Sequence, residues 1–100
     1  MIRASKSSQF EEDCERAILY LANANPAAAL RFIDAIDVAV QLLSQFPEIG
    51  PIWRHDDRPT RFFVLPQFRN YLIFYRIESD ELKLGRLLHG AQNLRDILEE

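Results

Sequence analysis

The stretch from Arg61 to Gly90 most constrains what this chain can fold into. It contains three runs rich in apolar and aromatic residues, separated by Pro66-Gln67 and by the polar segment 78–81. Short runs of this composition between turn signals are typical of β-strands that are joined by tight connections. The sequence therefore predicts an antiparallel β-meander.

The middle run, residues 71–77, is apolar at almost every position. Such a run is typical of a central strand covered on both faces, or of one whose second face meets a partner. In the next run, Leu82 and Leu84 alternate with Lys83 and Gly85, which predicts at least one buried side.

Two amphipathic helices are predicted before the meander. Ser8 and Glu11 fit a capping box, and apolar residues including Cys14 then recur at helical spacing. Asn25 and Pro26 suit the start of a second helix that runs to about Gln45. The short link between the helices predicts an antiparallel helical hairpin. Its apolar face is expected to contain Ala29, Phe32, Ile33, Ile36, Val40 and Leu43.

Three further segments complete the expected order. Residues 2–6 form a short first strand, residues 52–59 form a surface loop, and Leu94, Ile97 and Leu98 indicate a short C-terminal helix. The result is one α+β domain over residues 1–100, with the order β-α-α-β-β-β and a terminal helix. In this fold the helical hairpin packs on a twisted antiparallel sheet.

Composition excludes several classes of protein. Hydrophobic residues make up 48% of the chain and charged residues 27%, as in ordinary globular proteins, and the net charge of −3 argues against a nucleic-acid-coating protein. No uncharged run is long enough for a membrane span, so we expect a cytoplasmic protein. Cys14 is the sole cysteine, which excludes an intramolecular disulfide and predicts a buried, inert thiol.

The sequence contains no motif for a metal or a cofactor. His55 and His89 are far apart, and neither has a second histidine or cysteine nearby. Neither a Gly-rich phosphate loop nor a G-x-S-x-G elbow occurs. Arginine is more informative, because residues 51–76 contain five arginines and two aspartates, a formal charge of +3.

The arginines on or beside neighbouring strands could converge on one anion-binding patch for phosphate or an acidic partner segment. This patch would contain Arg61, Arg69, Arg76, Arg86 and His89. The alternative is that the arginines form ordinary surface salt bridges, each worth about 0–1 kcal/mol. Their partners would then be Glu78, Asp80, Glu81 and Asp96.

Three other side chains each allow two interpretations. His89 could act as a general acid or base, or it could bond a backbone carbonyl and fix a turn, which we favour. Tyr71 is a core aromatic or a partner contact rather than a catalyst. Trp53 is a partner anchor or a lid on the core.

Four motifs, in order, resemble the ParE branch of the RelE/ParE toxin superfamily over nearly the whole chain. They are Asn25 to Ala29 with Phe32, Leu43 to Gly50, Arg69 to Ile77, and Arg86 to Asn93. This resemblance implies the same architecture, and a bacterial type II toxin that a cognate antitoxin silences by wrapping a helix and an extended segment over it. Such toxins poison DNA gyrase, whereas RelE-type relatives cleave messenger RNA on the ribosome.

The resemblance favours a binding-type gyrase inhibitor with no catalytic residue, no metal and no cofactor. The expected contacts with target or partner are Trp53, Arg61, Arg69, Tyr71, Arg76, Arg86 and His89. The first alternative is a ribosome-dependent endoribonuclease that uses Arg61, Arg69, Arg76, Arg86 and His89. The chain departs from that pattern, because it has one lysine after residue 6 and no tyrosine after Tyr75. The second alternative is a weakly toxic corepressor that reaches operator DNA only through its antitoxin.

Overall fold

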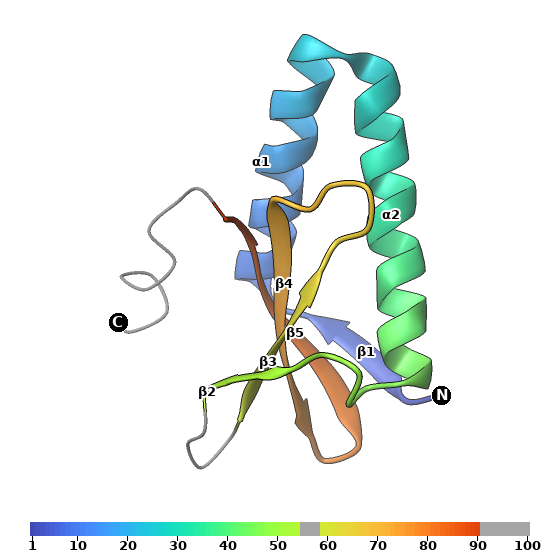
Figure 1. Ribbon diagram of the computed structural model, residues 1–100, viewed down its shortest axis with the longest axis vertical. Coiled ribbons are helices and arrows are strands. Elements are labelled where there is room, and N and C mark those ends of the chain that lie inside the picture. The colour runs from blue at the N-terminus through green and yellow to red at the C-terminus, as the bar shows by residue number, and fades with distance from the viewer. Residues whose placement is uncertain (55–58, 91–100) are drawn as a thin grey trace.

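The computed structural model describes residues 1–54 and 59–90, which form two helices and a five-stranded sheet (Figure 1). The elements are β1 (Arg3–Lys6), α1 (Ser8–Ala24), α2 (Pro26–Gln45), β2 (Ile52–Arg54), β3 (Thr60–Val64), β4 (Tyr71–Glu78) and β5 (Glu81–His89). The strand order is β1-β5-β4-β3-β2. The predicted α+β fold, with a helical hairpin on a mainly antiparallel sheet, is confirmed.

Two details of the predicted sheet are wrong. Residues 52–54 form the edge strand β2 instead of part of a loop, because the Trp53 ring packs edge-on against two aromatic rings of the neighbouring strands. In addition, β1 pairs with β5 in parallel. The meander leaves β5 with a free edge, and β1 covers part of this edge before the chain crosses into α1. The predicted C-terminal helix lies outside the described residues.

The start of α1 is fixed by Ser7, one residue before the predicted cap. The Ser7 Oγ accepts a hydrogen bond from the Phe10 N–H at 3.0 Å, and it donates one to the Gly85 carbonyl at 2.9 Å. The Ser7 N–H donates to the Leu84 carbonyl at 3.0 Å. A single serine therefore caps the helix and anchors its first turn to β5.

The second helix begins and ends where the sequence predicts. The Asn25 Oδ1 accepts hydrogen bonds from the N–H groups of Ala27 and Ala28, and Pro26 occupies the first helical position. The helix ends at Gln45, two residues before Pro47. Of the residues expected on its apolar face, Ile33 is 36% exposed and points away from the core.

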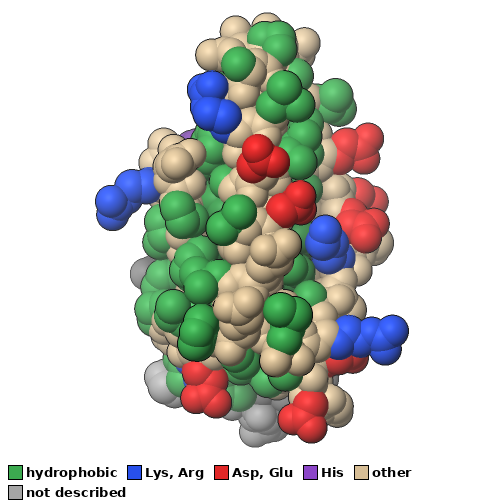
Figure 2. Space-filling model, turned by 90° about the vertical axis from the view of Figure 1, so that its right-hand side faces the viewer, with side chains coloured by type: hydrophobic (Ala, Val, Ile, Leu, Met, Phe, Trp, Pro, Cys, Tyr) green, Lys and Arg blue, Asp and Glu red, His purple; other side chains and the backbone are tan. Residues whose placement is uncertain are grey.

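The core lies between the helical hairpin and one face of the sheet. Phe10 from α1 and Phe32 and Leu43 from α2 pack there with alternate side chains of β4 and β5. All three are fully buried. Exposed hydrophobic side chains remain along the outer surface of α2. Figure 2 shows them in green, in a view from the side of the molecule on which α2 lies. Within the described residues, neither helix is both long and apolar enough to cross a membrane.

A register shift in β5 controls which side chains face the core. Phe74 pairs with Arg86 and Tyr75 pairs with Leu84, so that Gly85 is the extra residue of a β-bulge. Leu84 and Leu87 therefore both face the helices, although they are three positions apart. Arg86 therefore projects from the other face of the sheet, the one that does not face the core.

A network of polar groups, buried at the Gly50 N–H, holds the turn between α2 and β2. The Tyr75 hydroxyl donates to the Pro47 carbonyl at 2.8 Å and accepts from the Gly50 N–H at 3.0 Å. Arg61 Nη1 donates to the carbonyls of Glu48 at 3.0 Å and Gly50 at 2.8 Å. A Cβ at position 50 would overlap the Tyr75 hydroxyl, which explains the glycine. Burial raises the pKa of Tyr75, so the hydroxyl remains protonated and able to donate.

We expect the Tyr75→Phe substitution to lower the free energy of unfolding by about 2 kcal/mol, because the buried Gly50 N–H loses its acceptor. Chemical denaturation of the purified chain measures the change. Tyr20→Phe is the matched control, since Tyr20 is exposed on α1, and it should shift stability by less than about 0.5 kcal/mol. Equal effects of the two substitutions would contradict this role of Tyr75.

Candidate functional site on the open face of the sheet

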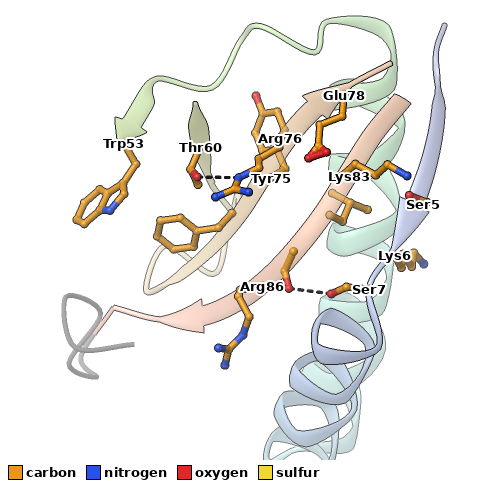
Figure 3. A pocket seen from close by; sticks show the side chains of 13 residues that line it. Ser5, Lys6, Ser7, Trp53, Thr60, Tyr75, Arg76, Glu78, Lys83 and Arg86 are labelled. Atoms are coloured by element: carbon orange, nitrogen blue, oxygen red, sulfur yellow. Dashed lines mark hydrogen bonds between the residues drawn. The ribbon is translucent and has the colours of Figure 1, made fainter. Parts of the chain in front are cut away.

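An open groove of about 470 Å³ lies on the face of the sheet opposite the helical hairpin (Figure 3). We call it the sheet groove. It combines basic side chains from three strands with aromatic side chains from two. These are Lys6 of β1, Arg76 of β4, Lys83 and Arg86 of β5, together with Trp53 of β2 and Phe74 of β4.

The alternation of β4 and β5 places these residues in the groove. Arg76 is paired with Lys83 across the two strands, and the two side chains therefore leave the sheet on the same side. Their neighbours Tyr75 and Leu84 point into the core. The same strands that build the core thus present positive charge on the other face.

Trp53 forms an aromatic wall of the sheet groove. Its ring contacts Phe62 at 6.0 Å and Phe74 at 5.8 Å between centroids, both nearly perpendicular. Phe74 is buried, whereas Trp53 remains 42% exposed. A large apolar surface held in place by two other rings is well suited to contact a partner.

The basic residues of the sheet groove differ in whether an acidic side chain of the same chain already balances their charge. Lys83 Nζ lies 2.9 Å from Glu81, and its hydrogen bond lowers the pKa of that carboxyl group. Arg76 donates from Nε to the Thr60 Oγ1 at 3.1 Å, and it forms no ion pair with any other described residue. The remaining N–H groups of Arg76 are the strongest candidates for binding an anion.

Arg86 is held by the carboxylate of Asp13, a residue of α1. Its Nε donates to Asp13 Oδ2 at 2.8 Å and its Nη2 to Oδ1 at 3.3 Å. The Leu87 N–H donates to the same Oδ2 at 3.0 Å. The Asp13 side chain is only 3% exposed. Arg86 therefore forms a partly buried ion pair with α1, and not one of the surface salt bridges within the meander that were considered as the alternative.

Asp13 could have been identified from its spacing. It follows Phe10 by three residues and precedes Ala17 by four, so it lies on the buried stripe of the helix. A carboxylate on such a stripe needs a partner. The sequence does not indicate which arginine that partner is, because 73 positions separate the two residues.

The remaining predicted site residues lie elsewhere. Arg61 points into the turn before β2, and Arg69 is exposed in the connection from β3 to β4. Tyr71 and His89 stack edge to face at 4.9 Å in a second groove that also contains Arg86. We call this second groove, lined by residues of α1, β4 and β5, the end groove. Of the seven predicted contact residues, the structure thus brings Trp53, Arg76 and Arg86 together in the sheet groove.

The fold is that of a small α+β protein in which a helical hairpin covers one face of a five-stranded sheet. Residues 5–94 match the family described as ParE toxin of type II toxin-antitoxin system, parDE. The chain belongs to this family, which confirms the resemblance seen in its sequence.

Among solved structures, a chain from the "Chromosomal ParDE TA system from P. aeruginosa" has a similar fold. Its TM-score is 0.73, with 19% sequence identity over 89% of this chain and 96% of that one. No match was found among curated proteins.

We expect Asp13→Ala to lower the free energy of unfolding by about 3 kcal/mol, because it leaves the Leu87 N–H without an acceptor and Arg86 without its counter-charge. Denaturation with urea measures this. Glu12→Ala, at an exposed neighbouring position, is the control and should change stability by less than about 0.5 kcal/mol. A small effect at Asp13 would show that the ion pair is dispensable for folding.

Proposed function

We propose that this toxin acts by binding, that its target is DNA gyrase, and that the sheet groove is the contact surface. The environment of Arg76 supports this choice of contact surface. Its guanidinium has a hydroxyl as its hydrogen-bond partner and lies in the same groove as the exposed Trp53. Within the described residues this guanidinium forms no ion pair, and an arginine beside an exposed aromatic side chain is the combination that dominates many protein interfaces. Family membership supports the choice of target.

The arrangement of the titratable groups supports binding over chemistry. General acid–base catalysis requires a proton donor or acceptor within hydrogen-bond reach of the reacting atoms, with charge stabilisers around them. His89 lines the end groove, whereas Arg76 lines the sheet groove. Arg61 is committed to two backbone carbonyls, and Arg86 to Asp13. The five residues considered for RNA cleavage are therefore divided among separate places.

Cleavage of messenger RNA is the second candidate function, and one observation favours it. Basic side chains and aromatic rings that line one groove are typical of surfaces that bind single-stranded nucleic acid. The sheet groove has both. In this case the basic residues would position the RNA backbone and stabilise charge.

We further propose that a cognate antitoxin neutralises the protein within a hetero-oligomer in the cytoplasm, and that operator DNA is reached only through the antitoxin. The description of the family as one half of a toxin–antitoxin pair supports this proposal. The exposed apolar side chains, including Trp53, are consistent with a surface that is covered in such a complex.

We expect Arg76→Gln to weaken inhibition of gyrase supercoiling by about tenfold or more, since a charge-assisted hydrogen bond contributes about 1.5–3 kcal/mol. Purified toxin, freed of antitoxin, is titrated into a supercoiling reaction. Arg31→Gln is the matched control, because Arg31 is exposed on α2 and does not line the sheet groove. Both variants should unfold within about 1 kcal/mol of the parent chain.

A parallel titration into a translating ribosome extract with labelled messenger RNA distinguishes the two candidates. Intact RNA with inhibited supercoiling supports the gyrase proposal. Cut RNA with unaffected gyrase overturns it and favours the nuclease. If neither reaction responds, the protein acts as an antitoxin-binding corepressor. Unchanged potency of Arg76→Gln against gyrase would remove the sheet groove as the contact surface while leaving the target assignment intact.

A further inference from the structure

The end groove has no role in the proposed function. It is an open cavity of about 460 Å³, within the range of about 300–1,000 Å³ that is usual for sites that bind a small molecule. It lies beside the last part of β5, beyond the final pair of β1 with β5 at Leu84, where α1 contacts the strand. Among the described residues that line the two grooves, Arg86 is the one that both share. The end groove is therefore a separate candidate for a binding site.

Two tyrosines form the aromatic part of the end groove. The ring of Tyr71 is held on two sides, because it packs edge to face against Phe32 at 5.0 Å and against His89 at 4.9 Å between centroids. Tyr20, in the last turns of α1, is 71% exposed. One fixed ring and one exposed ring at the same groove give a planar ligand two aromatic surfaces to contact.

Arg16 adds positive charge to the end groove from the same helix. Its side chain is 73% exposed and lies 3.9 Å from Asp13, a long ion pair of the kind that contributes little to stability. The oxygens of Asp13 already accept hydrogen bonds from Arg86 and from the Leu87 N–H. With two arginines against one aspartate, the described lining carries a formal charge of +1. The charge of Arg16 is therefore available to an anion.

The positions of these groups match a ligand that carries a flat ring and an anion. Arg16 and Tyr20 are four residues apart on α1, so they lie on one side of the helix, about 6 Å apart along its axis. Ala17, which also lines the groove, leaves space beside them because its side chain is short. A guanidinium suits a phosphate group, and an aromatic side chain suits a nucleobase. A nucleotide has both groups, with a sugar between them.

The Tyr71 hydroxyl gives the end groove a hydrogen-bonding group beside its rings. Burial raises the pKa of Tyr71, and Tyr20 adds to the increase, which places the two phenol groups near each other. The Tyr71 hydroxyl is therefore protonated near neutral pH, where it can both donate and accept. Nucleobases carry donors and acceptors at the edge of the ring, whereas an apolar side chain has none. The end groove is thus better matched to a nucleobase than to an apolar partner.

We propose that the end groove binds a nucleoside 5′-phosphate, with the base against Tyr20 and Tyr71 and the phosphate on Arg16. Arg86 acts as a positioning residue, because its ion pair with Asp13 holds α1 against β5. The same ligand chemistry is offered by a free nucleotide and by the phosphorylated end of a nucleic-acid strand. The proposal does not rest on gyrase being the target, because it concerns a different surface.

The first test is a calorimetric titration of the purified full chain, freed of antitoxin, with three probes. These are adenosine monophosphate, adenosine and ribose 5-phosphate. We expect adenosine monophosphate to bind about tenfold or more tightly than either of the others, because it alone supplies both the base and the phosphate. Equal affinity for adenosine monophosphate and one of the other probes would overturn the proposal, and so would the absence of binding.

Substitution of Arg16 tests the phosphate end of the site. Arg16→Gln changes an exposed position, so the fold should be retained. We expect it to weaken adenosine monophosphate by about tenfold and to leave adenosine unchanged, since a charge-assisted hydrogen bond is lost. Arg31→Gln makes the same change in charge on the exposed surface of α2, outside the end groove, and should leave both affinities unchanged. If the two substitutions weaken binding equally, general electrostatics explain it and the proposal is wrong.

Substitution of Tyr20 tests the base end of the site. Tyr20→Leu removes the exposed ring and should weaken adenosine monophosphate and adenosine by about tenfold each, because the stacking of a base on an aromatic side chain is lost. Tyr20→Phe keeps the ring and should bind as the parent chain does. Full affinity in Tyr20→Leu would overturn the placement of the base.

A nuclear magnetic resonance titration locates the nucleotide, which matters because the sheet groove also combines arginine with aromatic rings. We expect adenosine monophosphate to shift the backbone amide signals of Ala17 and Leu87, which line the end groove. The signals of Lys6 and Thr60, which line the sheet groove, should not move. If they move instead, the nucleotide binds in the sheet groove and the proposal is wrong.

Two further probes identify the source of the nucleotide. The first is a short oligoadenylate with a 5′-phosphate. If it binds more tightly than adenosine monophosphate, the end groove recognises the end of a nucleic-acid strand, and if it binds equally or more weakly, the ligand is a free nucleotide. Both results support the site. The second is a phosphotyrosine peptide, which also carries a ring and a phosphate. If it binds more tightly than adenosine monophosphate, the end groove recognises a protein segment, and the proposal is wrong.

Discussion

The carboxylate of Asp13 joins the two layers of this protein. It accepts hydrogen bonds from the Arg86 guanidinium and from the Leu87 N–H, and it is almost completely buried. It lies where the sheet would otherwise be incomplete, because β1 pairs with β5 only as far as Leu84. Beyond that point α1 replaces the missing strand, and the Asp13 side chain supplies the acceptor that a strand backbone would have supplied. The position of α1 against β5, and with it the shape of the end groove, depends on this contact.

The arginines of the sheet therefore serve different purposes. Arg86 stabilises the junction of helix and strand, and Arg61 holds the turn before β2 by donating to two carbonyls. Their donors are used within the chain. Arg76 has a single hydroxyl acceptor within the described residues, which leaves most of its guanidinium available. The distinction between structural and available arginines follows from burial and hydrogen bonding, and residue type alone does not reveal it.

Patterns of short range were readable from the sequence. Asn25 and Pro26 predicted the start of α2, and the apolar runs predicted the meander. The alternation of side chains along the meander in turn determines which face of the sheet carries Arg76. The features that were missed depend on partners far away along the chain. The edge strand at Trp53 depends on rings of β3 and β4, and the pairing of Asp13 with Arg86 spans 73 positions. The candidate site could thus be anticipated in its residue types, whereas its separation into distinct grooves required the β-bulge at Gly85 and the buried ion pair.

The parallel pairing of β1 with β5 also has a consequence for how the protein is made. Residues 3–6 are synthesised well before their partners at 81–84, from which 78 positions separate them. Contacts of such high sequence separation form late in folding. The first strand, and the Ser7 anchor that follows it, must wait until β5 has been synthesised. A nascent chain that has not yet reached β5 therefore lacks the assembled sheet, so a harmful protein of this design gains its working surface only after β5 has been made.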